Sequence, residues 1–226
     1  MSKSASSERS VATEHGRRRG RVLTERDLAI GEWIERVGGA TIGDVQMRFG
    51  LRRTVAFRRI AALADFGVIH RHRMIIGMPA LLSCRASMPR LDGYRHTVAL
   101  AGLVATRELA GGEILTEAEV LRLRSSSDDL FEQLDDPALE VIRNCDRVPD
   151  AIERTGVGGL IAWEVELTSK GKSRRERILG RYAASRYEEI RWLVPDPKLA
   201  ALIAAEIERM GLGEFMRVGA DAGSLA

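Results

Sequence analysis

The first third of the chain alternates apolar and polar positions with helical periodicity over three short segments. Gly38, Gly50 and Gly67 follow these segments, and Thr24 and Thr41 begin the first two. A hydroxyl side chain ahead of an apolar-periodic run marks a helix start, and glycine behind the run marks a helix end. The sequence therefore predicts three short helices, over residues 24–37, 41–49 and 52–66.

Two short runs, residues 68–73 and 81–85, follow the third helix and flank a short loop. Their composition predicts two strands of a hairpin. Three helices with tight turns followed by a hairpin are typical of a winged helix-turn-helix. We expect this domain to occupy residues 23–88, with a linker over residues 88–93.

The rest of the chain, residues 92–220, interleaves helical and strand-like patterns. Helical spacing ends at Gly111-Gly112, and Thr116 begins another helix. Further on, the pattern predicts a strand, a helix, a strand, a helix and a strand over residues 160–167, 172–187, 190–194, 199–210 and 215–218. This order predicts an α/β domain layered on a mixed sheet, and an α+β class for the whole chain. Residues 124–149 are weakly patterned and predict a long loop, with one turn of helix near residues 137–143.

Residues 160–167 carry two carboxylates within an otherwise apolar run. With the two-residue period of a strand, Glu164 and Glu166 fall on one face. A charge in such a run needs solvent, an ion partner or a bound cation. Upstream, Asp150 begins a short strand-like run, which the turn at residues 155–159 would fold back beside Glu164. We therefore expect Asp150, Glu164 and Glu166 to lie together.

Composition places the chain among soluble globular proteins. Of its 226 residues, 45% are hydrophobic and 30% are charged, so the chain has enough apolar residues for a core. The net charge of +3 and a pI of about 9.1 permit a polyanionic partner. Cys84 and Cys145 lie far apart, so we expect no disulfide framework or zinc site, and a cytoplasmic location. We expect neither export nor membrane insertion, because the N-terminal residues lack the apolar core of a signal peptide and no run reaches about 18 apolar residues.

Basic residues gather on the third predicted helix, on the hairpin behind it and in the N-terminal arm. The first turns of such a helix suit the major groove of DNA, and basic residues along a strand suit phosphates. Residues 1–22 are rich in Ser and Arg and are expected to be disordered, either as an arm in the minor groove or as a solubilising tail. The predicted DNA-binding residues are Arg52, Arg53, Thr54, Arg58, Arg59, His70, Arg71, Arg73, Arg17, Arg18 and Arg19.

Two chemical interpretations of the carboxylate cluster are open. Carboxylates on adjacent strands supply hard oxygen ligands for Mg²⁺, and a bound Mg²⁺ can activate water for phosphodiester hydrolysis. In that case the catalytic residues are Asp150, Glu164 and Glu166, and Asp150 and Glu164 bind the metal. Alternatively, Glu164 and Glu166 form ion pairs with the following helix, and Asp150 caps a turn. The expected ion-pair partners are Arg174, Arg175 or Arg177.

Two residues near the cluster have a structural interpretation. His96 lies on a predicted helix, and we expect it to pack on the sheet rather than to act as a catalytic base. Trp163 occupies the opposite face of the strand from Glu164, where we expect it to be a core residue among apolar neighbours.

At this cluster the chain resembles the restriction-endonuclease-like superfamily. The motif of that superfamily is an Asp near a strand start, followed by Asp/Glu-x-Lys on the next strand. The matching residues are Pro149-Asp150 and Glu164-Val165-Glu166. Glu166 stands where the motif has Lys. A few members of the superfamily are active with Glu at this place, and Lys170 or Lys172 could replace the missing Lys in space.

Most of residues 24–210 resembles the replication-relaxation family of actinobacterial plasmids and integrative elements. The likeness rests on the winged helix, His96 on a helix, Pro149-Asp150, the strand Trp163–Thr168, the Arg-rich helix after it and a strand ending in Val194-Pro195-Asp196. It implies a DNA-binding protein of a mobile element. Plasmid replication, mobilisation and transcription regulation are the contexts that it implies.

The leading hypothesis is a double-stranded DNA-binding regulator or replication factor, in which the nuclease-like domain serves assembly, DNA contact or ligand sensing. The alternative is a Mg²⁺-dependent DNA endonuclease or nickase that the same winged helix targets. A third hypothesis is a partner-binding adaptor with a dimer interface on the helix at residues 199–210. Because helix-turn-helix proteins often read paired half-sites, we expect a homodimer.

Overall fold

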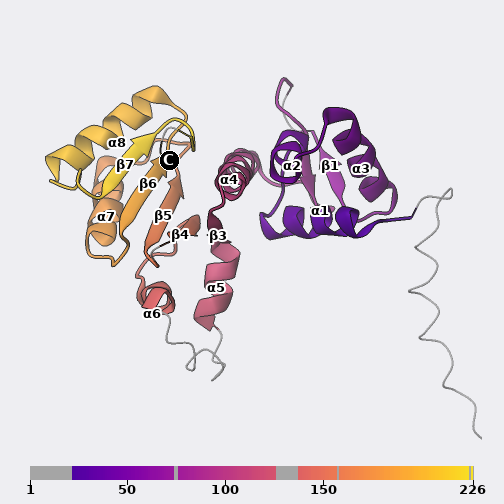
Figure 1. Ribbon diagram of the computed structural model, residues 1–226. Helices are drawn as coiled ribbons and strands as arrows, with labels where there is room; N and C mark the ends of the chain where they lie inside the picture. The colour runs from indigo at the N-terminus through magenta and orange to yellow at the C-terminus, as the bar shows by residue number, and fades with distance from the viewer. Residues whose placement is uncertain (1–21, 74–75, 126–136, 157, 224, 226) are drawn as a thin grey trace, which may run out of the picture. The chain divides into compact units, whose positions relative to one another are not determined.

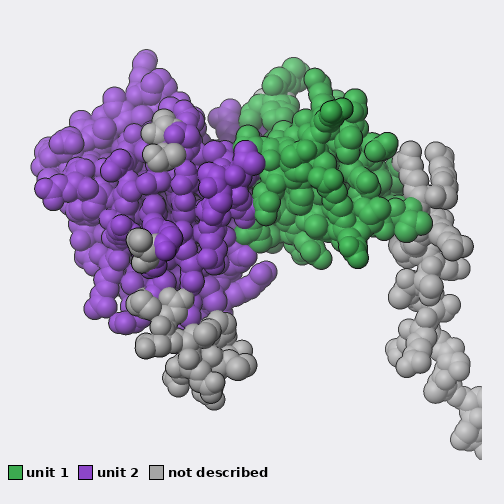
Figure 2. Space-filling model, in the orientation of Figure 1, with its two compact units in different colours: residues 1–89 green, residues 90–226 purple. Residues whose placement is uncertain are grey.

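The computed structural model describes residues 22–73, 76–125, 137–156, 158–223 and 225. Within these residues the chain is α+β, with eight helices and two sheets. It divides into two compact units, unit 1 at residues 1–89 and unit 2 at residues 90–226 (Figure 2). The predicted arm with Arg17, Arg18 and Arg19, and much of the predicted long loop, lie outside the described residues.

Unit 1 consists of three helices followed by an antiparallel hairpin (Figure 1). The elements are α1 (Glu25–Arg36), α2 (Ile42–Phe49), α3 (Arg53–Asp65), β1 (His70–His72) and β2 (Leu81–Ser83). In the hairpin, His70 pairs with Ser83, and Ala40 forms a further bridge to Leu82. The helices and strands predicted in this part of the sequence are confirmed.

Local hydrogen bonds explain where the helices of unit 1 begin and end. In a capping box, Thr24 Oγ1 accepts from the Asp27 backbone N at 3.3 Å, and the Asp27 carboxylate accepts from the Thr24 backbone N at 2.8 Å. Thr41 and Asp44 form the same pair of bonds at the start of α2. Gly50 ends α2 with a φ of 59°, a conformation that other residues rarely adopt. The fully buried core residues include Ile30, Ile34, Val45, Ile60, Leu63 and Leu82.

Unit 2 is built on a five-stranded mixed sheet (Figure 1). In sheet order its strands are β3 (Glu113–Thr116), β4 (Ala151–Arg154), β5 (Leu160–Val165), β6 (Glu189–Leu193) and β7 (Met216–Gly219). Strands β3, β4 and β5 pair antiparallel, whereas β5, β6 and β7 pair parallel. The β4–β5 hairpin confirms the predicted turn at residues 155–159. The sequence pattern did not predict β3, because its four residues run directly into the next helix.

Helices cover both faces of this sheet. Helix α4 (Leu91–Leu109) contacts β3 and β5 on one face. The other face shares the main apolar core with four helices, which are α5 (Glu117–Ser125), α6 (Pro137–Asn144), α7 (Lys172–Ala183) and α8 (Pro197–Arg209). The linker predicted over residues 88–93 is shorter than expected, because α4 already begins at Leu91. In the part of the chain that the structure describes, no helix has the length and apolar character to cross a membrane.

Candidate functional site

The three carboxylates singled out in the sequence line one cleft in unit 2. The cleft has a volume of about 370 Å³ and lies where β5 ends, between residues of α4, the segment before β4 and the segment that leads to α7. Asp150, Glu164 and Glu166 line it together with four basic side chains, which are Arg95, His96, Arg147 and Lys170. Acidic and basic side chains therefore line the same cleft.

Asp150 lies just before β4 and is fixed against the end of β5. Its Oδ2 accepts a hydrogen bond from the backbone N of Val165 at 2.7 Å, and its Oδ1 lies 3.4 Å from Nε2 of His96. The hydrogen bond to Asp150 raises the pKa of His96, although burial opposes the increase. The side chain of His96 is 37% exposed and lines the cleft, so beyond any packing on the sheet it is placed to contact Asp150.

Glu164 is buried and is held from two sides. Nε and Nη2 of Arg147 donate to its two carboxylate oxygens at 3.0 and 2.8 Å, and the Tyr182 hydroxyl donates to Oε1. Burial raises the pKa of Glu164, while the hydrogen bond from Arg147 acts in the opposite direction. Burial and the neighbouring Glu164 carboxylate raise the pKa of Tyr182, which keeps its hydroxyl protonated as a donor. The prediction that Glu164 pairs with an arginine of the following helix is therefore wrong. Its partner, Arg147, precedes Glu164 in the sequence.

Glu166 directly follows β5 and pairs with Lys170. Arg175, one of the expected partners, instead donates to the two oxygens of Glu206 on α8 at 2.8 and 2.7 Å. Lys172, the other lysine considered for the motif, lies 4.0 Å from a carboxylate oxygen of Glu176. Lys170 is therefore the lysine that the fold brings to the carboxylates.

A Mg²⁺ ion in the cleft would need several oxygen ligands in near-octahedral geometry. Among the residues that the structure describes, no group of three or more His, Cys, Asp and Glu side chains is arranged to hold a metal ion. A cation shared by Asp150 and Glu164 would have to displace Arg147, which occupies both oxygens of Glu164. The carboxylates of the cleft therefore do not fit a Mg²⁺ ion unless Arg147 moves. As the side chains stand, they form hydrogen-bonded ion pairs.

A second buried polar cluster lies on the opposite face of the sheet, and no pattern in the sequence predicted it. Glu153 of β4 accepts from Nε and Nη2 of Arg107 at 3.0 and 2.7 Å, and from the indole Nε1 of Trp163 at 2.9 Å. The guanidinium groups of Arg107 and Arg191 lie 5.8 and 5.4 Å from the Trp163 ring centroid. Trp163 is fully buried, as expected, and three charged side chains contact it, which are those of Glu153, Arg107 and Arg191. In the sequence, the one sign of this cluster is the carboxylate of Glu153 next to the apolar Ile152.

In unit 1, four of the predicted DNA-binding residues are exposed around the start of α3. Arg53, Thr54 and Arg58 project from the helix, and Arg52 precedes it without capping it through its side chain. The Arg53 guanidinium lies 5.6 Å from the ring centroid of Phe57, which is 41% exposed. The start of α3 therefore presents arginines, a hydroxyl and an aromatic ring to solvent.

The other predicted DNA-binding residues of unit 1 have different environments. Arg59 donates from Nη1 to Oδ2 of Asp27 at 2.9 Å, which ties α3 to the start of α1. On β1 and directly after it, Arg71 and Arg73 are exposed, whereas His70 is partly buried. Arg59 therefore has a structural partner, and the two arginines of the hairpin are available to an external anion.

Comparison of the chain with protein-family models, with curated proteins and with solved structures found no match. The likeness to the replication-relaxation family therefore stays a prediction. The exposed charge of unit 1 and the cleft of unit 2 are the features from which function is inferred.

Proposed function

We propose that the protein binds double-stranded DNA through unit 1. The observation that carries this proposal is the exposed, arginine-rich start of α3, whose first turn contains no acidic residue. Three helices followed by a hairpin have the element order of a winged helix-turn-helix, in which the third helix enters the major groove. Arg71 and Arg73 on the hairpin suit the phosphates beside that groove.

The distribution of charge along the chain supports the same proposal. Residues 1–89 contain sixteen Lys and Arg against eight Asp and Glu, whereas residues 90–226 contain nineteen against twenty-four. The positive charge therefore resides in the part of the chain with the exposed α3, as expected where basic side chains neutralise phosphates. As the biological context we propose a regulator or replication factor of a mobile element, acting in the cytoplasm as a homodimer on paired half-sites.

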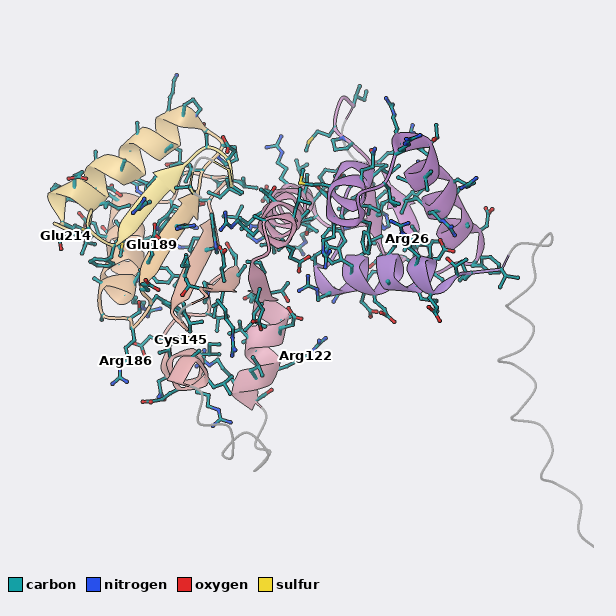
Figure 3. The ribbon with its side chains drawn as sticks, viewed as in Figure 1. Arg26, Arg122, Cys145, Arg186, Glu189 and Glu214 are labelled. Carbon is teal, nitrogen blue, oxygen red and sulfur yellow. The ribbon has the colours of Figure 1, made fainter. Side chains whose placement is uncertain are left out.

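Replacing both Arg53 and Arg58 by Ala is expected to weaken duplex binding by about 30-fold or more, since each arginine contact of a reading helix contributes about 1–3 kcal/mol. Fluorescence anisotropy would measure this on a duplex that the full-length protein has selected from a random-sequence pool. The matched control is Arg122→Ala with Arg124→Ala, two exposed arginines of α5, of which Arg122 projects outward in Figure 3. If R53A/R58A and wild type bind the selected duplex with equal affinity, α3 does not bind DNA and the proposal fails there.

A second candidate function is a Mg²⁺-dependent endonuclease targeted by unit 1, and only the residue types in the cleft of unit 2 favour it. Asp150 precedes β4, Glu164 lies on the paired strand β5, and Lys170 pairs with Glu166. Asp150, Glu164 and Lys170 are the residue types that the nuclease motif requires. The ion pair between Glu164 and Arg147 argues against this function, because a metal ligand needs free oxygens. We therefore propose that unit 2 does not cut DNA.

Supercoiled plasmid carrying the selected site is expected to stay intact when incubated with the protein and Mg²⁺ or Mn²⁺. Agarose electrophoresis distinguishes supercoiled, nicked and linear forms. Nicking that is lost in both Asp150→Asn and Glu164→Gln would replace the binding-only proposal with the endonuclease. R53A/R58A serves as a control, because a targeted enzyme would lose site preference in that variant.

A further inference from the structure

The exposed side of α7 carries a row of three arginines, Arg174, Arg177 and Arg181. With 3.6 residues per turn and a rise of 1.5 Å per residue, these positions fall within about 60° around the helix and span about 10 Å along it. The other side of α7 packs into the core through Leu179 and Tyr182. The row is therefore a defined face of a helix that the core holds in place.

No carboxylate of the described residues pairs with any arginine of this row, although the other charges of α7 are paired. Glu176, the one acidic residue of α7, lies 2.7 Å from Arg209 and 4.0 Å from Lys172. Arg175 is buried against Glu206. Like charges three and four residues apart on a helix repel each other, so the row destabilises α7 without an internal partner. This occurs in a unit whose acidic residues outnumber its basic ones.

Gly180 lies beside this row in the interior of α7, where glycine is less favourable than alanine. A Cβ atom added at this position would meet no other atom within 4 Å, so packing within the molecule does not require glycine. Ser173 and Ala184 lie on the same exposed side. This strip of small residues leaves room for the close approach of an external backbone.

We infer that this face of α7 is a second contact surface for the DNA backbone. Arg174, Arg177 and Arg181 bind phosphates, and Gly180 marks the closest approach. Duplex DNA carries one charge about every 1.7 Å of its axis, so a row about 10 Å long lies opposite several phosphates. Hot spots of protein interfaces combine arginine with Trp and Tyr, but α7 has no Trp and its Tyr182 is buried, so its exposed side has arginine without aromatic residues. This composition favours a phosphate backbone over an acidic protein.

This inference rests on the proposed function of unit 1 and extends it to unit 2. Phosphate contacts fix position and add affinity, but they carry no sequence information. The face of α7 should therefore strengthen binding to DNA that extends beyond the site read by α3, whatever the sequence of the extension.

The test is Arg174→Ala with Arg181→Ala in the full-length protein. On a duplex that extends well beyond the selected site, the slope of log K against log salt concentration should fall in magnitude by about 0.9 for each lost phosphate contact, hence by up to about 1.8. R122A/R124A removes the same charge from α5 and should leave the slope unchanged. Gly180→Ala should raise the Tm and yet weaken binding to the same duplex. If this face of α7 contacts only solvent, the same substitution should raise the Tm and leave DNA binding unchanged.

Two results would overturn the inference, and they differ in what they leave standing. If R174A/R181A and Gly180→Ala both bind as wild type does, while R53A/R58A binds more weakly as expected, unit 1 alone contacts DNA and the proposed function holds. If wild type binds no duplex at all, the proposed function fails together with the inference. Circular dichroism of each variant confirms that the fold is retained.

Discussion

Replacing Glu153 by Ala is expected to lower the free energy of unfolding of unit 2 by about 3–5 kcal/mol, because it leaves a buried charge without its partner. The side chains of Arg107 and Glu153 are only 13% and 6% exposed, and three hydrogen bonds join them. The indole Nε1 of Trp163 loses its acceptor in the same step. Urea denaturation followed by tryptophan fluorescence would measure the loss.

The matched control for this prediction is Glu113→Ala on the neighbouring strand β3. Glu113 is 66% exposed and lies 3.9 Å from Arg154, so its removal should cost about 0–1 kcal/mol. Glu153→Gln, which keeps an acceptor for Trp163 but loses the charge, should give an intermediate loss. Equal stability of the Glu153→Ala and Glu113→Ala variants would show that the buried cluster does not stabilise the sheet.

The elements of unit 1 could be predicted because local signals define them. Thr24 and Asp27 bracket the first turn of α1, and Gly50 ends α2 in the left-handed conformation. Hydrogen bonds between residues three apart depend little on the rest of the fold. The start of α4 was missed, because Gly93 was interpreted as part of a linker although it lies in the first turn of that helix.

The site in unit 2 was predictable only in part. Strand alternation and the glycine-rich turn brought Asp150 and Glu164 to one cleft, because a hairpin fixes which residues face each other. The partners of these carboxylates did not follow from any pattern. Arg147 lies 17 residues before Glu164, in a weakly patterned segment, and Tyr182 lies 18 residues after it.

The cluster around Glu153 shows the same limit more strongly. Arg107 and Glu153 are 46 residues apart, and their contact depends on how α4 packs on the sheet. A sequence pattern can indicate that a charge in a strand requires a partner, since an isolated buried charge is unfavourable. It does not indicate which of 35 Lys and Arg side chains is that partner.

Replacing Arg147 by Met is expected to destabilise unit 2 by about 3–5 kcal/mol at neutral pH, because the Glu164 carboxylate, 3% exposed, then has no cation beside it. Burial already raises the pKa of Glu164 above its unfolded value of about 4.3. The stability linked to such a group is fully present below the unfolded pKa and is lost as pH rises through the folded pKa. Without Arg147 the pKa of Glu164 in the folded protein rises further. The stability of the variant should therefore be closest to that of wild type in acid and furthest from it at neutral pH.

The double variant Arg147→Met with Glu164→Gln separates this electrostatic effect from lost packing. Removal of the buried charge should restore most of the stability at neutral pH and abolish the additional pH dependence, as measured by urea denaturation at several pH values between about 4 and 8. A loss in the single variant that is the same at every pH would mean that Arg147 acts through packing over the Tyr182 ring, 5.8 Å away. A loss that grows with pH means that the guanidinium neutralises Glu164, and a cation bound from solution would then have to replace a partner that the chain already supplies.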